Sequence, residues 1–184
     1  MKTIIFYLFI SSLFFAGCFS YKIVSDSRRY PKNPNFSIFP NDQLEQLESL
    51  IDFSAIYYKY DFAYWPDGTK IDGYNFMRFW PSGHVYMRVA DHIPSREDAE
   101  NFRTAYMGFY EISGTNLVIE QFVPNWGYIK SWGTISSNAI HEYKIERRDG
   151  GRCWQYPKDY TYIRHPIDGL SREPDWTPFF MIEE

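Results

Sequence analysis

Short stretches rich in aromatic residues alternate with turn residues from Phe53 to Arg164, and this alternation constrains the fold more than any other feature of the sequence. Phenylalanine, tyrosine and tryptophan make up 21% of the chain, and the stretches between turns are too short for long helices. Aromatic side chains are enriched in strands because they pack well on a pleated, half-buried surface. The sequence therefore predicts a mainly β fold.

The turn residues divide this region into strands that follow one another in meander order. Pro81 to Gly83 makes the clearest hairpin turn, and Ser95 is expected to cap a single helical turn. Pro157 is expected to bend or end the last strand, because proline has no N–H to donate to a neighbouring strand. We expect eight strands, over residues 53–60, 74–80, 84–89, 104–112, 117–123, 128–135, 139–147 and 153–164.

Several of these strands carry bulky residues on both faces. Tyr106 and Tyr110, for example, alternate with Met107 and Phe109. An open sheet with one face in water would alternate apolar and polar residues more cleanly. A closed barrel removes the sheet edges, and a barrel of about eight strands can hold one small ligand. We therefore expect an antiparallel up-and-down barrel of about eight strands, preceded by a short N-terminal helix.

Two segments, Phe79 to Tyr86 and Gly108 to Ile112, resemble those of small envelope lipoproteins with lipocalin-like barrels. The resemblance covers roughly residues 50–165 and rests on the order of the strands and turns rather than on a single motif. It implies a barrel fold and a cavity for a small apolar ligand.

Residues 1–17 have the layout of a signal peptide. Lys2 provides a positive start, an apolar run follows from Ile4 to Phe15, and small residues precede Cys18. The apolar run is short for a membrane span, which needs about 20 residues. The ending resembles the lipobox of bacterial lipoproteins, which implies that Cys18 becomes a mature N-terminus that carries acyl chains such as palmitate. Phe19 and Ser20, rather than an acidic residue, come directly after Cys18. This pattern resembles lipoproteins of the outer membrane, so we expect a lipid-anchored protein of the bacterial cell envelope.

The remaining segments flank the barrel. Residues 18–40 are polar and interrupted by prolines, and they predict a flexible tether between the lipid and the domain. Asn41 is expected to cap a short helix in which leucines recur on one face. We assign residues 41–167 to the barrel domain and residues 168–184 to a C-terminal tail that covers one barrel end or binds a partner.

Charge and cysteine content limit the partners of the protein. The formal net charge is −4 at pH 7, so we expect no nucleic-acid partner, because binding to a polyanion needs a basic surface. The chain has two cysteines. With lipid on Cys18, Cys153 has no partner in the chain, and it is expected to be a small buried apolar residue. The sequence identifies no protein partner.

Signals for catalysis and metal binding are weak. The sequence contains no Gly-x-Ser-x-Gly motif, no phosphate-binding glycine loop and no histidine pair at zinc spacing. His141 and Glu142 match only the start of a zinc-protease motif, and we interpret this match as chance. Glu111 and Glu120 interrupt apolar stretches, so they either point into the barrel as acid–base candidates or face outward, and we favour the outward orientation. We expect no cofactor, no metal and no enzyme activity.

Candidate ligand-binding residues come from the hairpin arginines and the aromatic residues. Two arginines on the arms of the first hairpin are placed to bind a polar headgroup inside a barrel, although pairing with surface acids is commoner. Aromatic side chains line many ligand pockets. The candidates are Arg78, Arg88, Tyr106, Tyr110, Tyr128 and Trp132. We therefore expect a membrane-anchored, non-catalytic binding module for a small apolar or amphipathic ligand. The alternative is a structural or protein-interaction lipoprotein with a filled barrel.

Overall fold

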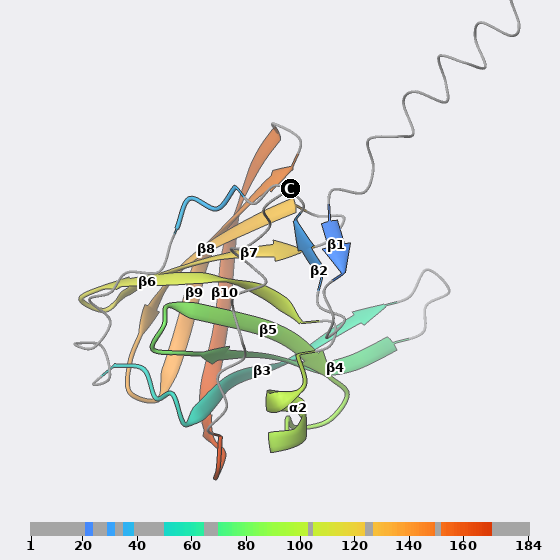
Figure 1. Cartoon of the computed structure of the whole chain (residues 1–184), viewed down its shortest axis with the longest axis vertical. Helices are drawn as coiled ribbons and strands as arrows, with labels where there is room; N and C mark the ends of the chain where they lie inside the picture. The colour runs from blue at the N-terminus through green and yellow to red at the C-terminus, as the bar shows by residue number, and fades with distance from the viewer. Residues whose placement is uncertain are drawn as a thin grey trace, which may run out of the picture.

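The computed structural model contains a closed antiparallel barrel of eight strands (Figure 1). Each strand pairs with the next along the chain, and the last strand pairs with the first. The expected fold class, a mainly β up-and-down barrel, is confirmed. The structure describes residues 21–23, 29–31, 35–38, 50–64, 70–102, 105–123, 127–149 and 152–170.

All eight barrel strands lie where the sequence predicts them, with ends that differ by a few residues. The largest differences are in the hairpin of β3 and β4, where β3 ends at Tyr64 instead of Tyr60 and β4 begins at Lys70 instead of Tyr74, because the ladder continues until Tyr64 pairs with Lys70. The strands are β3 (Ala55–Tyr64), β4 (Lys70–Phe79), β5 (His84–Ala90), β6 (Tyr106–Ser113), β7 (Asn116–Val123), β8 (Gly127–Ile135), β9 (Ala139–Asp149) and β10 (Arg152–Pro166).

Turn chemistry explains two local features of the barrel. Between β4 and β5, the N–H of Trp80 donates to the carbonyl of His84 at 3.0 Å, and Gly83 has a φ of 80°, a conformation that favours glycine. The register between β9 and β10 shifts between Pro157 and Tyr160. The bend expected at Pro157 is therefore a β-bulge, which tolerates the missing N–H of proline.

The expected helical turn is α2 (Arg96–Glu100), and its first residues form a capping box. The Ser95 side chain accepts a hydrogen bond from the Asp98 N–H, while the Asp98 carboxylate accepts one from the Ser95 N–H. These reciprocal bonds satisfy two N–H groups that a helix start leaves without partners. The helix expected after Asn41 lies outside the described residues.

The segment that the sequence predicts to be a tether contains structured parts. β1 (Tyr21–Ile23) and β2 (Arg29–Pro31) pair with each other as a separate two-stranded sheet. Further along, Phe36 and Ile38 are buried against the barrel. Two large apolar side chains gain more by packing on the domain than by remaining in water, so residues 35–38 belong physically to the domain.

The inner face of the barrel carries a core cluster to which all eight strands contribute. Because side chains alternate between the two faces of a strand, the strand registers place these residues on one common face. A cluster shared by every strand of a closed barrel lies inside it. Its strand members are Tyr57, Met77, Phe79, Val85, Tyr110, Leu117, Ile119, Ile135, Ile140 and Tyr162. Ile51, just before β3, packs against the same cluster at the end where β3 begins.

The outer face of β3 to β8 carries a second core cluster, which is covered by other parts of the chain. Phe36 makes edge-to-face contacts with Phe109, at 4.9 Å between ring centroids, and with Tyr128, at 5.0 Å. Ala99 of α2 and Leu170 also belong to this cluster. Residues 35–38, α2 and the chain after β10 therefore bury one side of the barrel from outside.

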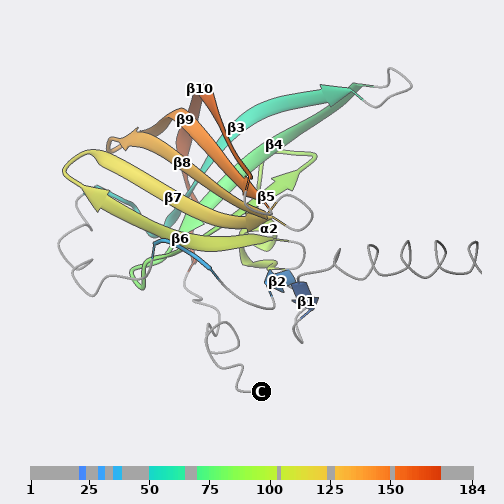
Figure 2. The same cartoon turned by 90° about the horizontal axis from the view of Figure 1, so that it is seen from above.

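The ladder that closes the barrel is short. β3 and β10 pair only from Ala55 to Tyr58 of β3, although β3 continues to Tyr64. Figure 2 shows β3 and β4 extending beyond the other strands. We call the place where the two strands separate, beyond Tyr58 of β3 and before Ile163 of β10, the seam. Among the described residues, β3 and β10 thus form no backbone ladder at the seam, where side chains such as Lys59 and Tyr160 contact each other instead.

Candidate functional site

The six ligand-binding residues that the sequence selects do not form one site. The registers place Tyr106 and Tyr110 on the inner face, with Tyr106 opposite Met87 and Tyr110 opposite Ile119. The other four lie on the outer face, and they are Arg78, Arg88, Tyr128 and Trp132. A ligand inside the barrel would therefore contact only the two tyrosines among them.

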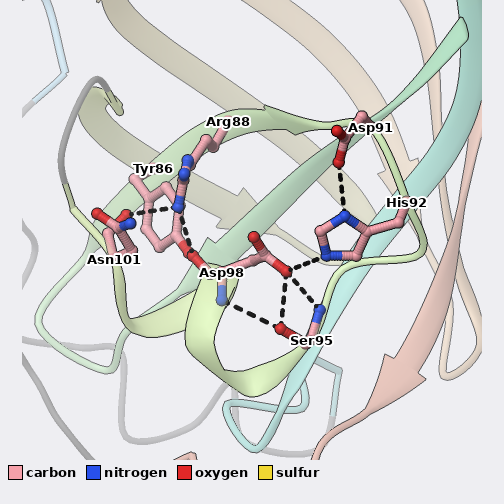
Figure 3. A network of polar contacts seen from close by, with 7 residues as sticks. All are labelled: Tyr86, Arg88, Asp91, His92, Ser95, Asp98 and Asn101. Atoms are coloured by element: carbon pink, nitrogen blue, oxygen red, sulfur yellow. Dashed lines mark hydrogen bonds and ion pairs between the residues drawn. The ribbon is translucent and has the colours of Figure 1, made fainter.

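Arg78 and Arg88 hold the end of α2 on the outer face. Arg78 is buried, and its Nη1 donates to the carbonyl of Ala99 at 3.0 Å. Arg88 donates from Nη1 to the carbonyls of Asp98 and Asn101, each at 3.2 Å (Figure 3). The last carbonyls of a helix lack partners within the helix, and arginine side chains are well suited to satisfy them. Through these bonds, both arginines hold α2 on the outer face of the barrel.

Tyr128 and Trp132 also contact other residues of the protein on the outer face. The hydroxyl of Tyr128 accepts a hydrogen bond from the Asn35 N–H at 2.7 Å, so it helps to hold the N-terminal segment. The ammonium of Lys144 lies 4.3 Å from the centroid of the Trp132 ring, a cation–π distance.

Glu120 faces outward, as favoured from the sequence, but it is buried. It lies opposite Lys130 of β8, and its side chain reaches under residues 35–38. Its Oε2 accepts hydrogen bonds from the N–H groups of Ser37 and Ile38, and Arg148 lies 2.7 Å from Oε1. Glu111 is exposed on the same outer face. The acid–base pair inside the barrel, considered as the other possibility, is thus not formed by these two residues.

The inner face contains a different group of polar residues, which we call the inner polar cluster: Lys59, Asp61, Glu142, Lys158 and Tyr160. Lys59, only 8% exposed, forms an ion pair with Asp61, and its Nζ lies 3.6 Å from the Tyr160 ring centroid. Lys158 approaches the same ring at 4.6 Å and pairs with Glu142 at 2.7 Å. Two ammonium groups therefore share one aromatic ring, and each is paired with its own carboxylate.

Glu142 is the most deeply buried member of the cluster, with 1% of its surface exposed. Within the described residues, neither of its oxygens receives a hydrogen bond of normal geometry, although Lys158 forms the ion pair with Oε2. Burial, and then the charge of the adjacent Glu142 and a hydrogen-bonding contact with it, raise the pKa of the Tyr162 hydroxyl well above its usual value. Tyr162 thus remains a neutral phenol beside a buried carboxylate.

The inner face is divided along the barrel axis into an apolar end and a polar end. Near the start of β3 it is lined by apolar and aromatic side chains such as Tyr57, Phe79 and Leu117. Toward the seam, buried polar side chains replace them. These are Lys59, Gln121, Ser131 and Glu142.

Sequence reasoning did not find the inner polar cluster. Glu142 was interpreted as part of a chance motif match, and Lys59 lies in an aromatic stretch in which both faces are bulky. The sequence does contain one signal for it, because side chains two residues apart on a strand point to the same face. Ile140 and Glu142 therefore share a face, as do Tyr57 and Lys59. That signal identifies a shared face but does not tell which face is inside.

Serine, histidine and aspartate also meet near the start of α2, in the arrangement of a helix cap. Ser95 Oγ donates to Asp98 Oδ2 at 2.7 Å, and His92 contacts Asp98 through Nε2 at 2.9 Å and Asp91 through Nδ1 at 2.6 Å (Figure 3). A nucleophilic serine needs the histidine itself as its partner, and here both contact Asp98 instead. Among the described residues, no group of three His, Cys, Asp or Glu side chains is arranged to bind a metal ion.

Cys153 is exposed, so the expectation of a buried apolar residue is wrong. It lies on β10 opposite Arg148 of β9, in the part of β10 that precedes the seam. Among the described residues, the outer apolar cluster under residues 35–38 and α2 has its strand members on β3 to β8 and none on β10. The outer surface of β10 thus contributes nothing to that cluster, and Cys153 stays exposed there.

No protein-family model matches the chain, and no curated protein or solved structure matches it either. In the part of the chain that the structure describes, no helix is long and apolar enough to cross a membrane.

Proposed function

We propose that the protein is a lipid-anchored, non-catalytic binding module of the bacterial envelope, in which the barrel takes one small apolar or amphipathic ligand. The anchoring rests on the sequence alone, because Cys18 lies outside the described residues. A lipobox-like ending after a short apolar run supports lipidation of Cys18, and Phe19 and Ser20 after it support the outer membrane as the location.

The division of the inner face is the observation that carries the binding proposal. A barrel of eight strands is just wide enough either to be filled by side chains or to hold one small ligand. Filling for stability alone favours apolar residues, because burying a charged side chain costs free energy even when it is paired. The protein buries Lys59 and Glu142 on the inner face nonetheless, beside the seam. Such costly polar groups are typical of binding sites.

An amphipathic ligand matches this division. Its apolar part would pack toward the aromatic end of the inner face, near Tyr110 and Met77, while its polar part would remain with the inner polar cluster near the seam. Transfer of apolar surface from water drives such binding, at about 25 cal/mol per Å² buried, and the polar contacts fix the orientation of the ligand.

Native mass spectrometry of the full chain, purified from bacterial membranes in detergent, tests this function. We expect an added small-molecule mass that disappears on denaturation and is recovered in the solvent extract. A protein that shows no added mass, both as purified and after incubation with an envelope lipid extract, would contradict the binding module.

The alternative is a structural or protein-interaction lipoprotein, and one observation favours it. Tyr60, Phe62 and Ile163 are more than half exposed, on the outer face of the two strands that border the seam. Exposed large apolar residues gathered in one place are typical of interaction sites. Replacement of Phe62 and Ile163 by Ser separates the two functions: loss of a protein partner with retained ligand mass supports a second role for this surface.

A further inference from the structure

The Glu142 carboxylate is a buried acceptor that contacts the Lys158 ammonium and the Tyr162 hydroxyl, but neither contact has normal hydrogen-bond geometry. It is 99% buried on the inner face, opposite Gly133 of β8 and Tyr160 of β10. Neither oxygen accepts a hydrogen bond of normal geometry there. A carboxylate can accept about four hydrogen bonds, and a buried one whose donors are poorly aligned is costly.

The charges around Glu142 indicate what kind of partner is missing. Lys158 pairs with Glu142, and Lys59 pairs with Asp61, so each of the two ammonium groups already faces a carboxylate. The ring of Tyr160 lies between these pairs and contacts both ammonium groups. The inner polar cluster therefore has balanced charges, and its Glu142 carboxylate has capacity left for a further, well-aligned hydrogen-bond donor.

The seam lies next to this acceptor. β3 and β10 do not pair beyond Tyr58, and Tyr160, which lies over the cluster, is 38% exposed. The bulge after Pro157 places Lys158 beside Glu142, with only 14% of the lysine side chain exposed. Tyr160 thus lies nearer to the surface, and Glu142 lies deeper in the inner polar cluster.

We propose that the ligand of this barrel carries a hydrogen-bond donor, a hydroxyl or an amine, at its polar end, and that Glu142 selects it against ligands with a carboxylate head. This inference rests on the proposed binding function. A donor head supplies the hydrogen bond that Glu142 lacks. A carboxylate head would place a second negative charge beside a buried one, where the low dielectric strengthens the repulsion.

Three probes with the same alkyl chain test the selection: 1-octanol, octylamine and octanoate, titrated calorimetrically into the full chain at pH 7.5. We expect octanol or octylamine to bind at least tenfold more tightly than octanoate, and the titrations distinguish the neutral from the cationic donor. In Glu142→Gln the affinity of the tighter donor probe should exceed that of octanoate by less than threefold, because the amide is uncharged and itself provides a donor. The ratio is compared between variants in one detergent, so partition of the probes into micelles cancels.

The control variant is Glu111→Gln, which removes an exposed carboxylate from the outer face and should keep the wild-type ratio. The double variant Glu142→Gln with Lys158→Met removes both charges together, so that no unpaired lysine remains in the barrel, and it should also lose the selection. Octanoate binding as tightly as the donors in the wild type, or an unchanged ratio in both Glu142 variants, would overturn the inference and leave the binding module standing. Failure of all three probes to bind would overturn it together with the proposed function.

Discussion

Arg148 and Glu120 form an ion pair on the outer face of the barrel that fixes the N-terminal segment to the domain. Arg148 Nη2 lies 2.7 Å from Glu120 Oε1 and also donates to the carbonyl of Asn35 at 2.8 Å. The other oxygen of Glu120 accepts the backbone N–H groups of Ser37 and Ile38. One buried carboxylate thus accepts hydrogen bonds from two backbone N–H groups of a segment that is not part of a sheet.

Glu120→Gln should destabilise the protein. The amide keeps the shape of the side chain but loses the charge, leaves Arg148 without its anion, and turns one acceptor into a donor. Hydrogen bonds to charged groups contribute about 1.5–3 kcal/mol each, and Arg148 is partly exposed, so we expect the free energy of unfolding to fall by about 2–3 kcal/mol. Urea denaturation measures it. Glu111→Gln, at an exposed site of the same face, should change it by less than about 0.5 kcal/mol. Equal effects of the two changes would contradict this role.

Gly108→Ala should be more damaging, because backbone atoms occupy the place of the new methyl group. A Cβ at this position would lie 2.0 Å from the carbonyl oxygen of Glu120 and 2.8 Å from the Cα of Gln121. Backbone of a paired strand cannot move away as a flexible side chain can, so we expect a loss of about 3 kcal/mol or more in urea denaturation. Gly114→Asn is the matched control: φ is 59° there, no atom lies within 4 Å of the added Cβ, and Asn tolerates that conformation. A mild effect at Gly108 would show that β6 and β7 are not so closely apposed.

The strands could be predicted from the sequence because turn chemistry marks their ends. Gly83 and the bend at Pro157 are local signals, and both have the structural consequence expected of them. The two faces could not be told apart in the same way. Phe109 and Tyr110 are neighbours of similar bulk and both are buried, yet Phe109 packs under Phe36 outside the barrel and Tyr110 packs inside. The difference arises from residues 35–38 and α2, which cover the outer face and are distant in sequence.

The candidate site was harder to predict for the same reason. Arg78 was a candidate for a ligand in the barrel because it lies on an arm of the first hairpin, and the structure provides a different partner, the carbonyl of Ala99. Glu142, which the sequence did not single out as a ligand contact, lies on the inner face. Only the strand register, which is a property of the closed barrel, shows that Arg78 faces outward and Glu142 faces inward.

His92 should make stability depend on pH. Hydrogen bonds to Asp91 and Asp98 raise the pKa of His92 above its usual value of about 6.5, since both carboxylates favour the protonated ring. A pKa that is raised in the folded state adds stability that is fully present below pH of about 6.5 and is lost as pH rises through the folded-state pKa. The melting temperature of His92→Gln should therefore lie below that of the wild type at pH 5.5, and the two should converge by pH 9. A difference that is constant over this range would contradict the coupling. The side chain is exposed, so the shift should be small.

Cys18→Ala should abolish lipid attachment, and Cys153→Ala should not. Acyl chains contribute about 0.8 kcal/mol of membrane affinity for each buried methylene, so two chains on Cys18 would hold the protein on a membrane without a spanning helix. The measurement is metabolic labelling with an alkyne analogue of palmitate, followed by the intact mass of the purified protein. Fractionation alone is less decisive, because an uncleaved apolar leader can keep the Cys18→Ala protein with membranes. Cys153 provides the matched control because it is the only other cysteine in the sequence and is exposed, so any unspecific acylation would appear there. A label retained in Cys18→Ala, or lost in Cys153→Ala, would contradict the anchor.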